Sequence, residues 1–345
     1  MRINNRKIGL NSPVYIIAEI SANHNQSFER AVAIIHAAKE AGADAVKIQT
    51  YTADTITIDS EKEYFRINGT LWDSMTLHGL YRDAYTPWEW QPKIKEVVES
   101  LGMDFFSSPF DPTAVTFLES IGVAAYKVAS PEIIDIPLLR LIGSTLKPVI
   151  MSTGMATLSE IDEAVRTLRD CGTTELLLLK CTSAYPAPVS EMNLRTIPHM
   201  AQSFGVPVGL SDHTMGYAVA VAAVALDACA IEKHLTLSRS DGGPDSGFSM
   251  EPAEFKAMVD AVRIVERAVG EICYQPSPNE IIPRLYRRSL FVTSDLKVGE
   301  IITEEKVRSI RPGHGLHPRY LPTILGRQAR RNVEKGTPFS WDMLD

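Results

Sequence analysis

Short apolar runs alternate with amphipathic helical patterns eight times between residues 15 and 270. Because these runs are mostly continuous in hydrophobicity, they predict strands that are buried on both faces of a sheet. The predicted strands cover residues 15–21, 45–50, 104–110, 124–130, 148–154, 176–183, 207–214 and 230–237. The predicted helices between and after them cover residues 28–41, 88–101, 113–121, 137–143, 158–171, 194–204, 217–226 and 252–269.

The helix ends support this division of the chain. A glycine follows the last apolar turn of many predicted helices, which is the residue that helix C-caps favour. These glycines are Gly42, Gly102, Gly122, Gly172, Gly205 and Gly270. Eight strand–helix units of this size predict an α/β fold, a (β/α)8 TIM barrel. An open doubly wound sheet is the alternative, but no Gly-x-Gly-x-x-Gly follows the first strand.

The pattern also predicts where the chain divides. Residues 1–274 form the predicted barrel domain, and the Pro-containing stretch 275–285 is a linker. Residues 286–345 contain short β-like runs at 289–293, 300–303 and 307–310, which predict a small β-rich domain. Within the barrel, the connection 51–87 is unusually long. Because it follows the second strand, we expect it to lie over the carboxyl face, where barrels place their sites.

Composition and charge exclude several classes of function. The chain of 345 residues is 45% hydrophobic and carries a net charge of −7, so it offers no basic field for nucleic acid or an anionic membrane. No apolar stretch approaches the roughly 20 residues of a membrane span, and no apolar signal core follows the N-terminus. The four cysteines are far apart and read as reduced thiols, which predicts a cytoplasmic protein.

Two histidines end the seventh and eighth predicted strands. His213 lies in Gly209-Leu-Ser-Asp-His-Thr214, and His234 lies in Glu232-Lys-His234. Adjacent parallel strands that both end in histidine could hold a divalent metal ion. The alternative is two unrelated polar side chains at the ends of strands.

Further polar residues end the other strands, and in a barrel they would converge on one place. Two lysines and several serines there suit a small anion that carries phosphate and carboxylate groups. A lysine of this kind could instead form a Schiff base. Each serine alone could simply bond to a strand end, and Glu19 could be a general acid or base or an ion-pair partner of Lys47 or Lys127. The candidates are Glu19, Lys47, Gln49, Ser108, Lys127, Ser130, Ser152, Ser183, Tyr185 and Ser211, with Asp245 in the following loop.

Taken together, these segments resemble the sialic acid synthase family of phosphoenolpyruvate-dependent nonulosonate synthases, over essentially the whole chain. The motifs are Ile17-Ala-Glu-Ile20, Val46-Lys-Ile-Gln49, Ser107-Ser-Pro-Phe110, Ala125-Tyr-Lys127, Met151-Ser-Thr-Gly-Met155, Cys181-Thr-Ser-Ala-Tyr-Pro186, the two histidine motifs and Gly243-Pro-Asp245. The C-terminal part, with Arg311-Pro-Gly, is similar to the family's antifreeze-like (SAF) domain. Leu71-Trp-Asp and Leu80-Tyr-Arg-Asp are most similar to the family's pseudaminic acid synthase branch.

The resemblance implies a reaction. Phosphoenolpyruvate would add through C3 to the aldehyde of an acylamino sugar, water would attack C2, and phosphate would leave by C–O cleavage. For this branch the sugar is a diacetamido-trideoxy hexose of the 6-deoxy-AltdiNAc type. An N-acetylneuraminate or legionaminate synthase that takes a ManNAc-type sugar is the alternative. A metal-dependent aldolase or hydrolase acting on a sugar phosphate, and a glycan-binding SAF protein without catalysis, are alternatives of other classes.

The resemblance also assigns roles. His213 and His234 would bind the metal, for which imidazole ligands favour Mn²⁺, with Mg²⁺ or Co²⁺ as alternatives. Glu19 matches the acid/base glutamate, and Arg311 matches an arginine that enters the partner's barrel in a domain-swapped homodimer. The sugar-facing positions are Gln49, Tyr185 and Asp245. The phosphoenolpyruvate-binding positions are Lys47, Ser108, Lys127, Ser130, Ser152, Ser183 and Ser211, although sialic acid enzymes carry Asn where this chain has Ser183.

Overall fold

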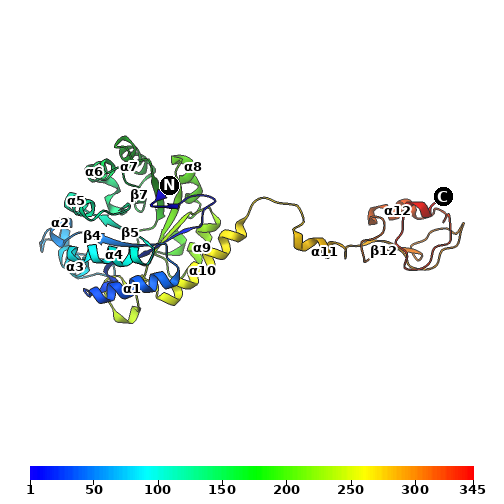
Figure 1. Cartoon of the computed structure of the whole chain (residues 1–345), viewed down its shortest axis with the longest axis horizontal. Helices are drawn as coiled ribbons and strands as arrows, with labels where there is room; N and C mark the ends of the chain where they lie inside the picture. The colour runs from blue at the N-terminus through cyan, green and yellow to red at the C-terminus, as the bar shows by residue number, and fades with distance from the viewer. The chain divides into compact units, whose positions relative to one another are not determined.

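A computed structural model describes the whole chain, residues 1–345. The chain divides into two compact units, Met1–Gly270 and Glu271–Asp345, and each has its own hydrophobic core. Figure 1 shows helices surrounding strands in the first unit, and short strands and helices in the second. No helix combines the length and the apolar character needed to cross a bilayer.

The first unit is built around a closed barrel of eight parallel strands, as the sequence predicts. The order around the barrel follows the chain, and the last strand pairs with the first. This closure brings His234 into register with Glu19. The strands are β3 (Tyr15–Glu19), β4 (Ala45–Thr50), β5 (Asp104–Pro109), β6 (Tyr126–Val128), β7 (Val149–Ser152), β8 (Leu176–Cys181), β9 (Val208–Asp212) and β10 (Ala230–His234).

Eight helices alternate with these strands and surround the barrel (Figure 1). Their ends carry the signals expected from sequence: Ser27 caps α1 at its start, and Gly42, with φ of 93°, ends it. The helices are α1 (Phe28–Ala41), α4 (Gln91–Ser100), α5 (Pro112–Ile121), α6 (Ile136–Ser144), α7 (Leu158–Asp170), α8 (Thr196–Phe204), α9 (Ala218–Ala225) and α10 (Pro252–Val269).

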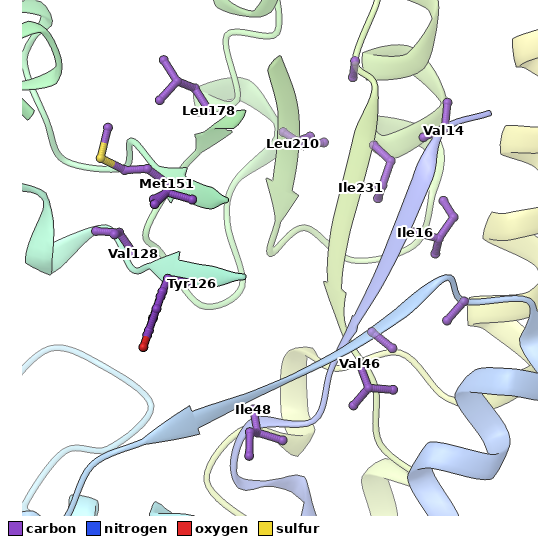
Figure 2. Packing of buried hydrophobic residues seen from close by; sticks show 14 of the residues in the cluster. Val14, Ile16, Val46, Ile48, Tyr126, Val128, Met151, Leu178, Leu210 and Ile231 are labelled. Carbon is purple, nitrogen blue, oxygen red and sulfur yellow. The ribbon is translucent and has the colours of Figure 1, made fainter. Parts of the chain in front are cut away.

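Side chains alternate between the two faces of each strand, which separates the core from the site. In β4, Val46 and Ile48 point outward into the cluster shared with the helices, whereas Ala45 belongs to a smaller cluster inside the barrel. Figure 2 shows outward-facing residues of this kind from several strands, including Val128 and Met151. The remaining inward positions of β4, Lys47 and Gln49, line a pocket at its carboxyl end.

A short antiparallel hairpin, which the hydrophobic pattern did not predict, precedes the barrel. Its strands are β1 (Arg2–Ile3) and β2 (Arg6–Lys7). Ile3 and Ile8 are buried in the inner cluster, together with Phe106 of β5. Arg6 forms ion pairs with Asp44, at 2.7 Å, and with Asp104. The hairpin therefore adds apolar contacts and charge pairs near the amino ends of β4 and β5.

Except for β4, the barrel strands end slightly before their predicted ends, and the polar residues that follow lie in turns and loops. After Glu19 the backbone enters the 3₁₀ helix η1 (Ser21–His24), and Ser21 has a positive φ of 47°. The long connection 51–87 is not structureless. It contains α2 (Ala53–Ile56), the 3₁₀ helix η2 (Glu63–Phe65) and α3 (Leu77–Ala84).

The second unit is small and has few regular elements. They are α11 (Ile281–Arg284), β11 (Ser289–Val292), β12 (Val307–Ile310) and α12 (Leu321–Ile324). The two strands pair antiparallel, and Leu290 and Val307 contribute to the core of this unit. The predicted run 300–303 is not a strand. Only an isolated bridge forms there, between Ile301 and Gln328.

Candidate active site

One pocket of about 350 Å³ lies at the carboxyl ends of the barrel strands and gathers most of the candidate residues. Its walls come from the strand ends, from the connection 51–87 and from the loop after β10. Ten predicted side chains line it: Lys47, Gln49, Lys127, Ser130, Ser152, Tyr185, Ser211, His213, His234 and Asp245. The sequence therefore identified the polar part of a real cavity.

Four buried charged side chains form a cluster at the pocket: Lys47, Lys127 and Glu232 line it, and Glu19 contacts Lys47 without lining it. Lys47 Nζ lies 2.8 Å from Glu19 Oε2 and 3.2 Å from Glu232 Oε1. Lys127 Nζ lies 3.8 Å from the same oxygen of Glu232. All four side chains are at least 95% buried, so the two ammonium groups and two carboxylates compensate each other away from water.

Burial and neighbouring charge move these groups in different directions. Burial raises the pKa of Glu19 to about 7, although Lys47 opposes the shift. Burial also lowers the pKa of Lys127 to about 8, against the attraction of Glu232. Burial opposes the charge on Lys47 as well, but Glu19 and Glu232 outweigh it and raise the pKa of Lys47. Of the two carboxyl groups in this cluster, Glu19 is therefore the one suited to exchange a proton near neutral pH.

Hydroxyl groups surround the two lysines. Lys127 Nζ donates to Ser152 Oγ at 2.7 Å, and Ser211 Oγ donates to Glu232 Oε1 at 3.3 Å. Ser130 Oγ accepts from the backbone N–H of Gly154 at 3.0 Å. We call Lys47, Lys127, Ser130, Ser152 and Ser211 the cationic side of the pocket. Its ammonium and hydroxyl donors can bind phosphate and carboxylate oxygens.

The two histidines face each other across one corner of the pocket. Their ring centroids are 5.4 Å apart. His213 Nδ1 lies 3.1 Å from the carbonyl oxygen of Thr182, so a proton on Nδ1 leaves the Nε2 lone pair free. His234 Nδ1 is buried without a hydrogen-bond partner. Burial, with the charge of nearby cations, holds the pKa of His234 well below its ordinary value, so its imidazole is neutral.

Aromatic rings enclose the histidines. Tyr185 lies 4.4 Å from His213 and Phe248 lies 4.9 Å from His234, between ring centroids. Trp72, from the connection 51–87, packs 5.7 Å from Tyr185, and its indole N–H donates to Pro244 O at 2.8 Å. This contact fixes the long connection to the loop after β10. The observed arrangement agrees with the expectation that the connection lies over the carboxyl face.

Gln49, Ser21 and Asp245 form a hydrogen-bonded chain at another edge. Gln49 Nε2 donates to Ser21 Oγ at 3.0 Å, and Ser21 Oγ donates to Asp245. Asp245 also accepts from the backbone N–H of Ala22. Burial raises the pKa of Asp245, against these hydrogen bonds. The positive φ of Ser21 is the backbone conformation from which this bond is made.

The connection 51–87 gives the pocket a second, apolar side. We call this side the apolar wall. It can pack against methyl groups of a ligand, but it offers no hydrogen-bond partner to a hydroxyl group. Beside the pocket, Glu132 in the 3₁₀ helix η4 (Pro131–Ile134) keeps Oε2 buried without a partner, and burial raises the pKa of Glu132 to about 7. The apolar wall consists of Ile67, Leu77, Leu80 and Ala84 from the connection, completed by Phe110, which follows β5.

Four candidates do not line the pocket. Glu19 is fully buried and reaches it through Lys47 and Gln49, whose Nε2 donates to Glu19 Oε1 at 3.4 Å. Ser108 is also fully buried, with no partner for its hydroxyl. Ser183 lies near the pocket, 3.8 Å from Cys181 Sγ. Arg311 belongs to the second unit and is exposed.

The structure adds residues that the candidate set did not contain. Glu232 belongs to the motif that contains His234 but was not a candidate itself, yet it pairs with both lysines. Gly154 lacks room for a side chain, because a Cβ there would lie 2.7 Å from Ser130 Oγ and even closer to Ser183 Oγ. Glu132 and Trp72 are single polar or aromatic residues in loops. No spacing rule marks Glu132, whereas the motifs Leu71-Trp-Asp and Met151-Ser-Thr-Gly contained Trp72 and Gly154.

Comparison with known proteins shows which family the chain resembles. Residues 34–274 match the NeuB family, and residues 287–345 match the SAF domain. The chain is 46% identical to the pseudaminic acid synthase of Campylobacter jejuni over 323 residues, which is 94% of each chain. It is 42% identical to the pseudaminic acid synthase of Helicobacter pylori, covering 96% of this chain and 98% of the relative.

A solved structure shows the same architecture. The crystal structure of N-acetylneuraminic acid synthetase from Leptospira borgpetersenii, in complex with citrate, aligns with a TM-score of 0.73 at 32% identity. The alignment covers 82% of this chain and 94% of that one.

Proposed function

The chain belongs to the NeuB family and carries a SAF domain, and from this we propose that it is a pseudaminic acid synthase. The reaction would join C3 of phosphoenolpyruvate to the aldehyde carbon of a 6-deoxy-AltdiNAc-type sugar. One water molecule would add at C2, and inorganic phosphate would leave with the bridging oxygen. The observation that carries the proposal is the division of one pocket into a cationic side, an imidazole corner and an apolar wall.

The cationic side suits phosphoenolpyruvate. Lys127 and Ser152 are already 2.7 Å apart, so their donors are fixed before any anion arrives. Lys47 adds a second ammonium group close by. Holding phosphate and carboxylate on fixed donors restricts the motion of the reactant, which is the main contribution that such a site can make to the rate.

Glu19 suits proton transfer within the same cluster. Its pKa near 7 allows both protonation states at neutral pH, and Lys47 and Gln49 hold its two oxygens. We propose that Glu19 exchanges a proton with the substrates as carbon–carbon bond formation turns the aldehyde oxygen into a hydroxyl group. In this role Lys47 would also stabilise the carboxylate form.

The imidazole corner suits a divalent metal ion. His234 Nδ1 is buried and unpartnered, and a neutral His213 with its proton on Nδ1 would keep Nε2 free, so both rings could offer lone pairs. No group of three or more His, Cys, Asp or Glu side chains surrounds one point, so the protein would supply two ligands, His213 and His234, and water or substrate the others. Bound there, an ion such as Mn²⁺, or alternatively Mg²⁺ or Co²⁺, would act as a Lewis acid toward the aldehyde.

The apolar wall suits the sugar. A 6-deoxy, diacetamido hexose carries methyl groups that gain by contact with Leu77, Leu80 and Phe110. Gln49, Asp245 and Tyr185 would bind its amide and hydroxyl groups at the polar edge. A sugar with more hydroxyl groups would place some of them against side chains that cannot bond to them.

We also propose a domain-swapped homodimer in which Arg311 enters the partner's barrel. The supporting observation is the apolar surface of residues 271–286. Ile272 and Tyr274 are 93% and 96% exposed, and Ile281, Ile282, Leu285 and Tyr286 are at least half exposed. Apolar patches of this kind mark interaction surfaces in water.

We also propose a cytoplasmic location, which fits the four cysteines, all of which are free.

The test is incubation of the protein with phosphoenolpyruvate, Mn²⁺ and a panel of acylated hexoses. We expect mass spectrometry to detect a nine-carbon product only with the 6-deoxy diacetamido sugar, with an equal amount of released phosphate. Preference for a ManNAc-type sugar would contradict the proposed substrate. Phosphate release without any sugar would contradict the reaction itself.

A further inference from the structure

A buried ion pair joins the two strands that carry the histidines, on the side of the sheet away from the pocket. Lys233 Nζ lies 2.7 Å from Asp212 Oδ2, and the two side chains are 1% and 0% exposed. Asp212 directly precedes His213, and Lys233 directly precedes His234. Neither residue of the pair lines the pocket.

The register of the sheet explains this placement. Lys233 of β10 lies directly beside Asp212 of β9. Because successive side chains on a strand point to opposite faces, these two residues face the helices. His213 and His234 point the other way, into the pocket. A change in the twist or tilt of either strand would therefore disturb the ion pair and the imidazoles together.

The same pair also closes the turn after β9. Asp212 Oδ1 accepts from the backbone N–H of Thr214 at 2.9 Å and from its hydroxyl at 2.8 Å. Lys233 Nζ donates to the carbonyl oxygen of Thr214 at 2.5 Å. The residues on both sides of His213 are thus held by one carboxylate and one ammonium group.

Stability alone does not account for a pair of this kind. Moving two charges out of water is costly, and well-packed apolar side chains of similar volume often stabilise a fold as well or better. A hydrogen-bonded pair does provide a fixed geometry, which apolar contacts define less sharply. In metalloproteins, groups that hydrogen-bond to the metal ligands orient them and thereby set the affinity. The Asp212–Lys233 pair would act one step further out, through the backbone of the two strands that carry the imidazoles.

We propose that Asp212 and Lys233 are positioning residues that hold the two imidazoles in the mutual orientation needed to bind a divalent ion. The inference rests on the proposed metal role of His213 and His234. Neither Asp212 nor Lys233 would touch the ion or the substrates.

The test compares full-length D212N/K233M with the wild-type chain. Asn at position 212 keeps an acceptor for Thr214, and Met at position 233 fills the space of the lysine, so the variant removes the charged link without leaving one charge unpaired. After chelator treatment, free Mn²⁺ is followed by electron paramagnetic resonance during titration. We expect the variant to fold and to bind Mn²⁺ about tenfold or more weakly. Wild-type affinity in the folded variant would overturn the inference.

Two further variants keep this test decisive. If D212N/K233M does not fold, D212N/K233Q restores a neutral hydrogen-bonded link and should bind Mn²⁺ with intermediate affinity. Binding by D212N/K233Q as tight as that of the wild type would count against the need for a charged pair. The control is E119Q/K147M, which removes an ion pair of 2.6 Å beside the amino end of β7. Its Mn²⁺ affinity should equal that of the wild type.

A second readout separates this inference from the proposed metal role. Histidine ring signals of the metal-free protein, observed by NMR after ¹³C-histidine labelling, are sensitive to the surroundings of His213 and His234 and therefore to a change in their packing. We expect both signals to shift or broaden in D212N/K233M and to stay unchanged in the control. If the wild-type chain binds no Mn²⁺, the metal role fails, while unchanged ring signals in D212N/K233M would refute the positioning role.

Discussion

At the scale of single residues, Gly154 shows how closely the pocket is fitted. It follows β7 and lies between the hydroxyl groups of Ser130 and Ser183, where a methyl group would collide with both. Its backbone N–H donates to Ser130 Oγ, so it also fixes one donor of the cationic side. The absence of a side chain at this position is therefore part of the site.

Gly154→Ala should reduce kcat/KM for phosphoenolpyruvate about hundredfold, because small displacements of binding groups have effects of that size. Steady-state kinetics would measure this, and circular dichroism would confirm that the fold is kept. Gly247→Ala is the control, since a Cβ there meets nothing within 4 Å. An equal loss in both variants would point to a general loss of stability instead.

His24 gives a prediction about pH and stability. It is fully buried, with Nε2 3.2 Å from Thr86 Oγ1, and burial lowers its pKa to about 4. The folded protein therefore resists protonation that the unfolded chain accepts near pH 6.5. The stability due to the neutral ring is complete above pH 6.5 and declines as the pH falls toward 4, by about 3 kcal/mol at most.

His24→Asn keeps an acceptor but removes the titrating ring, so its free energy of unfolding should change less between pH 7 and pH 4 than that of the wild type. Urea unfolding at several pH values would measure the difference. His36→Asn, on the exposed face of α1, should keep the wild-type pH dependence. Equal slopes for the wild type and His24→Asn would show that other groups cause the acid sensitivity.

Most polar candidates could be predicted one residue at a time because each ends an apolar run. The run places the strand, and the barrel then brings its end to a common face. Ser21 and Glu132 could not be predicted in this way. The importance of Ser21 depends on its φ of 47° and its contact with Asp245, and that of Glu132 depends on an oxygen left without a partner. Such properties arise only after the chain has folded.

At the scale of elements, the position of the connection 51–87 could be predicted from the sequence, but its shape could not. Its length and its place after the second strand predicted that it covers the site. Its short helices, and the contact of Trp72 with Pro244, depend on partners distant in sequence. The strands and helices of the barrel were predictable because hydrophobic periodicity is local, whereas the shape of this connection is not.

The apolar wall should make α3 a determinant of sugar choice. Leu80→Ser places a hydroxyl in the wall, so we expect kcat/KM for the 6-deoxy sugar to fall about tenfold relative to that for its 6-hydroxy analogue. Competition between the two sugars, followed by mass spectrometry, would measure this ratio. Leu71→Ser is the matched control, because Leu71 is 57% exposed in the same connection and does not line the pocket.

An unchanged ratio in Leu80→Ser would mean that the methyl group of the sugar binds elsewhere. A changed ratio in Leu71→Ser would mean that the whole connection, and not its apolar wall, selects the sugar.

At the scale of the whole molecule, the proposed dimer makes each site depend on two chains. Arg311→Ala and His213→Ala should each be inactive alone, for different reasons. Mixing the two chains should restore activity, because each mixed dimer contains one barrel with intact histidines that faces an intact arginine. Subunit exchange after mild denaturation, followed by a phosphate release assay, would measure the recovery. No recovery is expected if Arg311 serves its own barrel.

The division into two units was visible in the sequence as a change from strand–helix alternation to short β-like runs. What the sequence did not show is the apolar surface of residues 271–286, because most of this stretch was predicted as a Pro-containing linker. Burial depends on the folded surroundings, and a local pattern cannot report it.

The closure of the barrel through β10 and β3 has a consequence for folding during synthesis. Glu19 is made early, but its neighbour in the sheet, His234, is made only after the six barrel strands β4 to β9 that lie between them in the sequence. A growing chain already contains the lysines and serines of β4 to β8 while the residues of the imidazole corner have not yet been made. A chain that ended before β9 would thus lack both histidines and could not complete the proposed site.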